Sequence, residues 1–466
     1  MKILNRYRSP YDLLLPLGDA ACAVLLFGVS RALLSATGYA DIAHWSTPLV
    51  QAAMMAIVVV MAFYFVDLYA VDTDLPLRDR LLGVMTGFGV VCLLVGGLGM
   101  ISPSLSFAHV RLVELALVGS ALFFWHQRFA RGLKNGPILS RVLIVGTQQI
   151  GRLVAEQIYL KKHLRMEVVG FIGTRYDTIT LDCGNPKRVF HCVFPPHAIL
   201  NLVESRSVDR ILVTRGENCD AFPADDLLAI RLRGLRIEDC HSFCERIMSR
   251  IPIVDLQPRW LVLGRGFSRN SRLRFAKRIS DIVLAILCAL VSAPICLLAA
   301  IAVKLDSAGP VFYSQERAGL FEQPFTLYKF RSMMHNAEAA SGPMWAGGDD
   351  PRVTRVGKIL RLFRIDELPQ LFNILRGEMS MVGPRPERPF FVARFKGTIP
   401  YYHLRFAVKP GLTGWAQVSY PYAATDEDAL QKLTYELYYI KNISLWFDFQ
   451  ILFLTLKIVL LGRGAQ

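Results

Sequence analysis

The chain has 466 residues, enough for two or three domains that each bury a core of their own. At 53% hydrophobic residues it is too apolar for an ordinary soluble protein, so membrane segments are expected. Its formal net charge of +15 is compatible with nucleic acid, an anionic membrane surface or an anionic substrate, and does not choose among them.

Four apolar stretches separated by short loops come first, over roughly 13–35, 47–70, 82–101 and 108–127. Each has about the 20 residues that a helix needs to cross the hydrocarbon core. Basic residues precede the first stretch and follow the fourth, so the positive-inside rule places both ends of this block in the cytoplasm. We therefore expect four transmembrane helices within residues 1–135, and no cleavable signal peptide.

Short buried strands then alternate with helices. The strands are "RVLIVG", "MEVVGFIG" and "VDRILVT", and 148–160 and 197–205 are helix-like. The alternation predicts a parallel sheet in a Rossmann-like α/β domain over 136–257. In its first turn Gln148 stands where a dinucleotide fingerprint needs glycine, so that backbone can approach a pyrophosphate. We expect a spacer or assembly module without a cofactor, with nucleotide binding as the alternative.

The cysteines of this region leave a metal site open. Cys240 and Cys244 lie four residues apart with His241 beside them, but the chain has no CxxC pair among its nine cysteines. Reduced thiols in a cytosolic domain are the simpler interpretation.

A basic segment, 258–278, leads into a fifth apolar stretch, Ile282 to Val303. No nucleic-acid recognition motif accompanies the basic residues, so contact with lipid headgroups is favoured. Pro294 should break the helix, and Ser292 can satisfy backbone groups freed at the break. Positive charge flanks both ends, which assigns both to the cytoplasm. These features predict a re-entrant helix over about 280–303.

The last part of the chain completes a domain predicted over 258–466. Its end, "SLWFDFQILFLTLKIVLLG", is apolar but contains Asp448 and Lys457, which favours an interfacial helix over a further span.

This domain contains five motifs in close succession: "KRISDIVLA", "DSAGPVFYSQERAG", "LYKFRSM", "DPRVTRVGKILRLFRIDELPQLFNILRGEMSMVGPRPE" and "VKPGLTGWAQV". In order and spacing they resemble the bacterial polyprenyl-phosphate sugar-1-phosphate transferases. The N-terminal block and the middle domain resemble the long members of that family, which initiate exopolysaccharide or O-antigen synthesis. The resemblance implies a mainly helical, monotopic catalytic domain on the cytoplasmic face of the bacterial inner membrane.

The reaction implied by the resemblance moves a sugar-1-phosphate from a nucleotide diphosphate sugar, such as a UDP-hexose, to undecaprenyl or another polyprenyl phosphate. It uses Mg²⁺ and releases a nucleoside monophosphate. Both substrates are polyanionic, so the catalyst must hold them together and screen the repulsion between phosphates.

The resemblance makes Asp366 the nucleophile and a ligand of Mg²⁺. Its carboxylate would hold the sugar phosphate as an acyl phosphate, which divides one difficult step into two. Glu367 would support it, either as a magnesium contact or by electrostatics. In isolation the same two residues could be a salt-bridged helix end.

Basic side chains near this pair are expected to bind phosphate. Arg361 lies where the family places a phosphate-binding arginine, and Arg385 lies between two prolines that stiffen its backbone. Lys329 and Arg331 are expected to reach phosphate or lipid headgroups.

Further polar residues follow the pair along the chain. Gln370 and Asn373 could orient the substrate or cap and pack a helix. The glycine-punctuated loop "KPGLTGWAQV" could admit the nucleotide, with Gln417 as a contact, while Trp415 could anchor the lipid interface instead. Glu436 departs from the aspartate that the family usually has after the tyrosine at 435.

Other functions explain less of the sequence. A membrane-anchored nucleotide-sugar dehydratase needs an intact fingerprint and a Tyr-x-x-x-Lys couple, and the chain has neither. A non-enzymatic membrane scaffold or nucleotide sensor leaves the motifs around Asp366 unexplained. We expect an enzyme whose partners are a nucleotide sugar, a lipid phosphate and membrane lipids, acting as a homodimer, with no nucleic acid. The sequence does not identify the sugar.

Overall fold

The computed structural model describes short pieces within the first 128 residues and then residues 140–161, 164–173, 178–181, 188–191, 199–214, 223–264, 266–267, 271–334, 350–420 and 425–460. Apart from a few N-terminal residues, the chain forms one compact unit up to Phe243 and another from Cys244 onwards. The four predicted transmembrane stretches lie largely outside the described residues. One apolar helical piece, Pro16–Leu25, belongs to the first of them.

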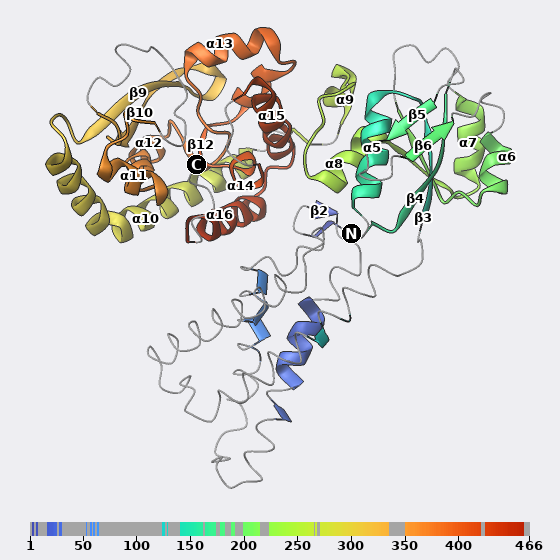
Figure 1. Ribbon diagram of the computed structural model, residues 1–466, viewed down its shortest axis with the longest axis horizontal. Coiled ribbons are helices and arrows are strands. Elements are labelled where there is room, and N and C mark those ends of the chain that lie inside the picture. Colours follow the sequence, from blue (N-terminus) through green and yellow to red (C-terminus); the bar gives the residue numbers. More distant parts are fainter. Residues whose placement is uncertain are drawn as a thin grey trace. The chain divides into compact units, whose positions relative to one another are not determined.

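The first unit contains a four-stranded parallel sheet with the strand order β4-β3-β7-β8 (Figure 1). Its strands are β3 (Ser140–Val145), β4 (Met166–Ile172), β7 (Arg210–Val213) and β8 (Arg236–Asp239). Helix α5 (Gln149–Leu160) covers one face, and α6 (Ile199–Ser205) and α7 (Ala224–Leu232) cover the other. A short antiparallel pair, β5 (Thr178–Leu181) and β6 (Arg188–His191), lies beside it. The predicted parallel sheet is confirmed.

The turn after β3 shows why it needs a glycine. Gly146 has a φ of 111°, and a Cβ there would collide with Thr214 Oγ1 at the end of the neighbouring strand. Thr214 in turn donates a hydrogen bond to the carbonyl of Val145 at 3.1 Å. Close packing between two strands thus accounts for this glycine without a bound nucleotide.

The second unit begins inside α8 (Cys240–Met248) and includes α9 (Pro258–Leu263). Trp415 Nε1 donates to the carbonyl of Ser249 at 2.8 Å, and the amide of Ile251 donates to the carbonyl of Thr434 at 3.0 Å. The boundary predicted at 257 therefore falls within this unit. Trp415 is only 4% exposed and packs in the core, so the suggestion that it anchors the lipid interface is wrong.

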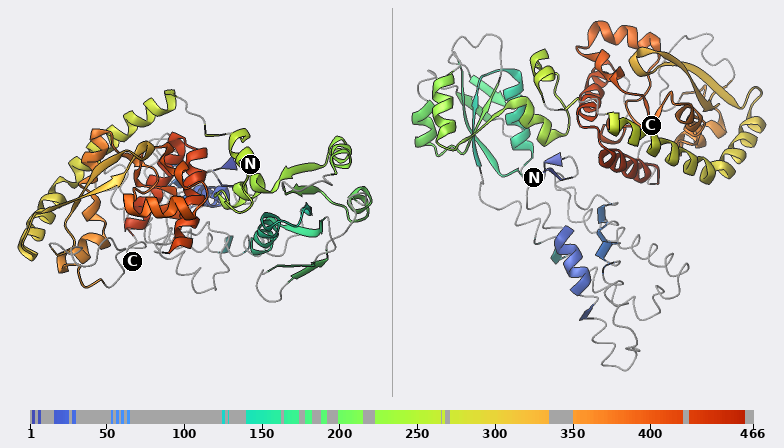
Figure 2. Two further views of the ribbon diagram at one scale, coloured as in Figure 1. Left: turned by 90° about the horizontal axis from the view of Figure 1, so that it is seen from above. Right: turned by 180° about the vertical axis from the view of Figure 1, so that it is seen from behind.

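The longest element is α10 (Ser271–Asp306), a continuous helix that contains Pro294. Figure 2 shows it as one ribbon that curves along its length. The predicted break is therefore wrong: proline removes one backbone donor, and the flanking turns continue. Ser292 donates its hydroxyl hydrogen to the carbonyl of Cys288 at 2.6 Å, a bond to the residue four positions before it, whereas the carbonyl that Pro294 leaves without its amide partner is that of Leu290. Within the described ranges α10 is the one helix long and apolar enough to cross a membrane.

The remaining elements of the second unit follow α10 in a mainly helical arrangement. They are β9 (Phe312–Ala318), η4 (Leu320–Glu322), β10 (Pro324–Phe330), α11 (Arg355–Leu362), η5 (Ile365–Glu367), α12 (Gln370–Arg376), β11 (Ser380–Val382), α13 (Pro389–Thr398), η6 (Tyr402–Ala407), β12 (Gly411–Thr413), α14 (Trp415–Ser419), α15 (Asp426–Lys441) and α16 (Leu445–Leu460). Strands β9 and β10 are antiparallel, and β11 and β12 are parallel. The core lies around α15, where Leu433 and Leu437 are fully buried.

Arg331 closes the C-terminal end of α10. Its Nη1 donates to the carbonyl of Ala308 at 2.7 Å, and its Nη2 donates to the carbonyl and the hydroxyl of Ser307 at 2.7 and 3.0 Å. A cation at a helix C-terminus also interacts favourably with the helix dipole. The structure thus gives Arg331 a capping role in place of the expected contact with phosphate or headgroups.

Candidate active site

Asp366 and Glu367 lie together in η5, a single 3-10 turn between α11 and α12. Arg364, the residue just before η5, has a φ of 54°, a left-handed conformation that is unfavourable for a residue with a Cβ. This backbone turn redirects the chain between the two helices. Each of the two acidic residues is 7% exposed, so the pair is not part of an ordinary charged surface.

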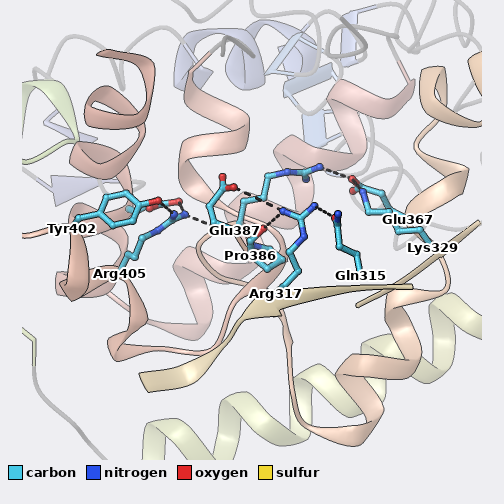
Figure 3. A network of polar contacts seen from close by, with 10 residues as sticks. Gln315, Arg317, Lys329, Glu367, Pro386, Glu387, Tyr402 and Arg405 are labelled. Atoms are coloured by element: carbon cyan, nitrogen blue, oxygen red, sulfur yellow. Dashed lines mark hydrogen bonds and ion pairs between the residues drawn. The ribbon is translucent and has the colours of Figure 1, made fainter. Parts of the chain in front are cut away.

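Glu367 is held by three cations, two of which come from other segments. Figure 3 shows Glu367 beside Lys329, whose Nζ donates to its Oε1 at 3.2 Å. Arg385 Nη2 donates to the same oxygen at 2.7 Å, and Arg364 Nη1 lies 3.9 Å from Oε2. Burial alone would raise the pKa of Glu367, but Arg385, Lys329 and Arg364 together lower it well below its usual range. Glu367 is therefore a fixed anion that holds basic side chains in place.

Asp366 has a different environment although it is the adjacent residue. Lys329 Nζ lies 4.0 Å from its Oδ2. Burial raises the pKa of Asp366; Lys329 opposes the rise, Glu367 adds to it, and Arg361 and Arg385 oppose it further. Its carboxylate is therefore more basic than that of an ordinary aspartate. Neighbouring acids whose pKa values are pushed apart are typical of sites that assign them different roles.

Lys329, which comes from β10, is itself perturbed. Burial lowers the pKa of its ammonium group, and the nearby Glu367 carboxylate raises it in part. Lys329 thus lies beside both acids from a partly buried position, which supports its predicted place in the site.

Two arginine side chains hold the backbone carbonyls of the loop that carries Arg385. Arg405 Nη2 donates to the carbonyl of Arg385 at 2.9 Å, and Arg317 Nη1 donates to the carbonyl of Pro386 at 3.1 Å (Figure 3). The loop begins at Gly383, where a Cβ would collide with the carbonyl of Lys409. Arg385 is therefore placed by its backbone before any substrate arrives.

Arg405 is a buried cation that sequence reasoning missed. Its Nη2 also donates to Glu436 Oε1 at 2.7 Å, and Nη1 donates to the hydroxyl of Tyr402. Both charged side chains of the Arg405–Glu436 pair are 5% exposed. Glu436 thus supports the loop of Arg385. The one signal in the sequence was the unusual glutamate at 436, and its partner could not be identified without the fold.

Of the other predicted residues, Arg361 and Gln370 lie near Asp366, whereas Asn373 and Gln417 bond to the backbone of their own unit. Arg361 Nε donates to the hydroxyl of Ser332 at 2.9 Å, and its charge acts on Asp366. Gln370 is buried at the start of α12, one turn after Asp366. Asn373 on the same helix bonds to the backbone of β10, so it packs rather than orienting a substrate. Gln417 Nε2 donates weakly to the carbonyl of Leu412 at 3.4 Å.

The donor chemistry of the site fits Mg²⁺. Asp366 and Oε2 of Glu367 offer carboxylate oxygens, while Oε1 of Glu367 accepts from two cations. No three His, Cys, Asp or Glu side chains converge in the described part of the chain, the Cys240, His241 and Cys244 group included. Mg²⁺ commonly takes one or two carboxylates and completes its shell with substrate phosphates and water, so this small donor set suits it.

Comparison with known proteins gives the class of this site. The family model of bacterial sugar transferases matches residues 272–462, which include the whole carboxylate site. A UDP-N-acetylgalactosamine-undecaprenyl-phosphate N-acetylgalactosaminephosphotransferase of Aeromonas hydrophila is 48% identical over 321 residues, covering 68% of this chain and 75% of that protein. A UDP-glucose:undecaprenyl-phosphate glucose-1-phosphate transferase of Xanthomonas campestris pv. campestris is 31% identical over 344 residues, covering 71% and 69%.

A glucose-1-phosphate transferase of the same description from Escherichia coli K12 is 44% identical over 241 residues, covering 51% of this chain and 48% of that protein. The chain belongs to the polyprenyl-phosphate sugar-1-phosphate transferase family, and it is a transferase enzyme. The expected family is confirmed, and the dehydratase and scaffold alternatives are set aside.

Asp366 has neighbours of opposite charge, Glu367 and Lys329, and replacing them should shift the pH dependence of activity in opposite directions. As the nucleophile that the sequence leads us to expect, Asp366 would have to be ionised to attack phosphorus, so activity should fall on the acid side at a higher pH than for an ordinary aspartate. Glu367→Gln removes a negative neighbour, lowers the pKa of Asp366 and should move this acid limb to lower pH. Lys329→Met removes a positive neighbour and should move it to higher pH.

The measurement is the pH profile of nucleotide release in a rapid quench without lipid acceptor, so that titration of the acceptor phosphate does not contribute. An acid limb that stays at the wild-type position in both variants would contradict the electrostatic assignment.

Proposed function

We propose that this enzyme transfers a sugar-1-phosphate from a UDP-sugar to undecaprenyl phosphate, releases UMP, and thereby performs the first membrane step of exopolysaccharide or O-antigen synthesis. The observation that carries the proposal is the buried pair of unequal carboxylates among Lys329, Arg361 and Arg385. The relatives named above act on UDP-sugars and undecaprenyl phosphate, which supports it. Because they are named for N-acetylgalactosamine and glucose, we propose a UDP-N-acetylhexosamine or a UDP-hexose as donor.

In the first half-reaction, an oxygen of Asp366 attacks the phosphorus attached to the sugar. The bond from that phosphorus to the bridging oxygen breaks, UMP leaves with this oxygen, and the sugar phosphate stays on Asp366 as an acyl phosphate. Asp366 suits this role better than Glu367, because Oε1 of Glu367 already accepts from Arg385 and Lys329. A raised pKa also makes the Asp366 carboxylate the more basic nucleophile.

In the second half-reaction, an oxygen of undecaprenyl phosphate attacks the same phosphorus. The bond between this phosphorus and the Asp366 oxygen breaks, so the sugar phosphate passes to the lipid phosphate and the Asp366 carboxylate is regenerated. Arg385, Lys329 and Arg361 neutralise phosphate charge throughout, and their placement before substrate binding lowers the reorganisation required. Bound Mg²⁺, held by Asp366 and Oε2 of Glu367, would supply further neutralisation of the diphosphate.

The second unit has the surface needed to meet a lipid substrate. Along α10 the apolar side chains are exposed, with Leu290 at 68% and Val291 at 76%. Trp446 and Phe449 of α16 are also exposed, while Asp448 and Lys457 of that helix are buried. We propose that α10, which is unbroken but curved, uses this curvature to enter one leaflet and return, with both ends at the cytoplasmic face of the inner membrane, and that α16 lies at the interface.

The reaction type predicts its nucleotide product. Membranes that contain the full chain, undecaprenyl phosphate and UDP-sugar labelled in the sugar should release UMP and transfer label to the lipid fraction. Parallel incubations with UDP-glucose and UDP-N-acetylgalactosamine would identify the preferred donor. Release of UDP in chromatography would point to an ordinary glycosyltransferase and sink the proposal.

The covalent step predicts a trapped adduct. Without lipid acceptor, wild type should accumulate hydroxylamine-sensitive sugar label on a peptide that contains Asp366. Asp366→Asn keeps the size but not the charge, so turnover should fall by roughly four to six orders of magnitude with no adduct.

Glu367→Gln is the matched control, because it should slow turnover severely and still leave the first half-reaction detectable. An adduct that persists in Asp366→Asn, or that never forms in wild type during turnover, would leave direct attack by the lipid phosphate as the mechanism.

The re-entrant proposal predicts which side of the membrane each end of α10 faces. Single cysteines near residues 270 and 320, in a cysteine-free chain, should both react with an impermeant reagent from the cytoplasmic side alone. Reaction on opposite sides would establish a full span.

A further inference from the structure

Two side chains near the start of α10 hold β11 from one side. Lys277 Nζ donates to the carbonyl of Val382 at 3.0 Å, and Asp281 Oδ1 accepts from the amide of Met381 at 3.0 Å. Positions 277 and 281 lie one helical turn apart, so both side chains leave the same face of α10. Adjacent backbone groups of β11 are thereby attached to one turn of this helix.

Buried polar groups complete this attachment. Lys277 Nζ also donates to Asp448 Oδ2 at 2.6 Å, and the hydroxyl of Tyr439 donates to Asp448 Oδ1 at 2.8 Å. The same hydroxyl lies 3.0 Å from the carbonyl of Val382. Helices α10, α15 and α16 thus converge on the last residue of β11.

The strand β11 leads directly into the loop of Arg385. Two residues, Gly383 and Pro384, lie between Val382 and Arg385. Because β11 also pairs with β12, and Arg405 holds the carbonyl of Arg385, little freedom remains between the strand and this side chain. A displacement of β11 would therefore move the guanidinium that contacts Glu367.

Arg278 attaches the other catalytic segment to the same turn of α10. Its Nη1 and Nη2 donate to the carbonyls of Ile374 and Leu375 at 2.6 and 2.8 Å, at the C-terminal end of α12. Helix α12 begins at Gln370, three residues after Glu367. The chain segments that carry the carboxylate pair and Arg385 are therefore both anchored within five consecutive residues of α10, 277–281.

The exposed apolar surface of α10 starts beside the anchors, with Phe275 and Ile279, and continues along the helix beyond them. Val283, Ile286 and Leu287 are each about half exposed. One end of the helix is thus part of the catalytic domain, while the next turns present apolar side chains suited to lipid. If the helix behaves as a rigid body, a change in its depth or tilt in the lipid also moves the end that is anchored in the catalytic domain.

We propose that Lys277, Arg278 and Asp281 are positioning residues, through which the seating of α10 in the membrane sets the placement of Arg385 and of the carboxylate pair. This rests on the transferase reaction proposed above. The same contacts could also serve stability alone, as buried ion pairs and caps often do. If the anchors position Arg385, removing one of them should lower kcat less once Arg385 itself has been changed. If they serve stability alone, the loss of kcat should be the same with and without that change.

The test uses the full chain in phospholipid nanodiscs and measures UMP release. Asp281→Leu removes the acceptor for the amide of Met381, and kcat should fall about tenfold to a hundredfold, the scale of a small misplacement of catalytic groups. Asp281→Asn keeps an acceptor oxygen and should restore most of the wild-type kcat. In an Arg385→Lys background, Asp281→Leu should cost much less, because the side chain that it positions is already altered.

Arg331→Met is the matched control, since Arg331 also binds backbone carbonyls of the same unit but at the far end of α10. The double variant Arg331→Met with Arg385→Lys should show a loss of kcat equal to the product of the two separate losses. If Asp281→Leu fails to fold, Arg278→Met, which removes only the contacts with α12, takes its place in a cycle with Glu367→Gln.

Two results would overturn the positioning role while leaving the reaction intact: unchanged kcat in the anchor variants, or losses that multiply independently in these cycles as they do for Arg331→Met. Wild-type enzyme that turns over without releasing UMP would overturn the reaction itself, so the two failures are distinguishable.

Discussion

The buried, ionised carboxylate of Glu367 is the interaction around which the catalytic domain is organised. Removing a charge of this kind from water costs several kcal/mol unless partners compensate it. Lys329 from β10, Arg385 from the loop after β11 and Arg364 at the start of η5 provide that compensation. Lys329 and Arg385 each bring a separate segment to this point, while Arg364 comes from the same turn as Glu367. The requirement to neutralise one anion therefore also assembles the cations that a phosphate-transferring site needs, before any substrate is present.

The adjacent acids illustrate how position alone can divide catalytic roles. Asp366 and Glu367 are chemically similar and equally buried, yet the cations lie closer to Glu367. Glu367 is consequently the structural anion, and Asp366 keeps a more basic carboxylate. This asymmetry lets a chain rich in positive charge concentrate that charge on anionic substrates without permanently pairing Asp366, the residue that we propose as the nucleophile.

Sequence patterns predicted what depends on local periodicity and on contiguous motifs. The parallel sheet followed from apolar runs such as that of β3, and Asp366 followed from its motif. Long-range partners left no comparable signal. Arg405 and Glu436 lie 31 residues apart and become a pair only through the packing of η6 against α15. The sequence could not show that Arg331 binds backbone carbonyls instead of phosphate, because the same side chain serves both purposes and carbonyl groups occur at every residue. Pro294 predicted a break, but the turns around it preserve the helix.

The contacts of the segment that follows Phe243 decide where the polypeptide can be divided. Trp415 Nε1 and the carbonyl of Thr434 find their partners at Ser249 and Ile251. A truncation that started at 258 would leave the buried Trp415 Nε1 without its acceptor, at a cost of about 1–3 kcal/mol. An isolated transferase module should therefore include the chain from Cys244 onwards, because the apparent connector between domains packs into the module itself.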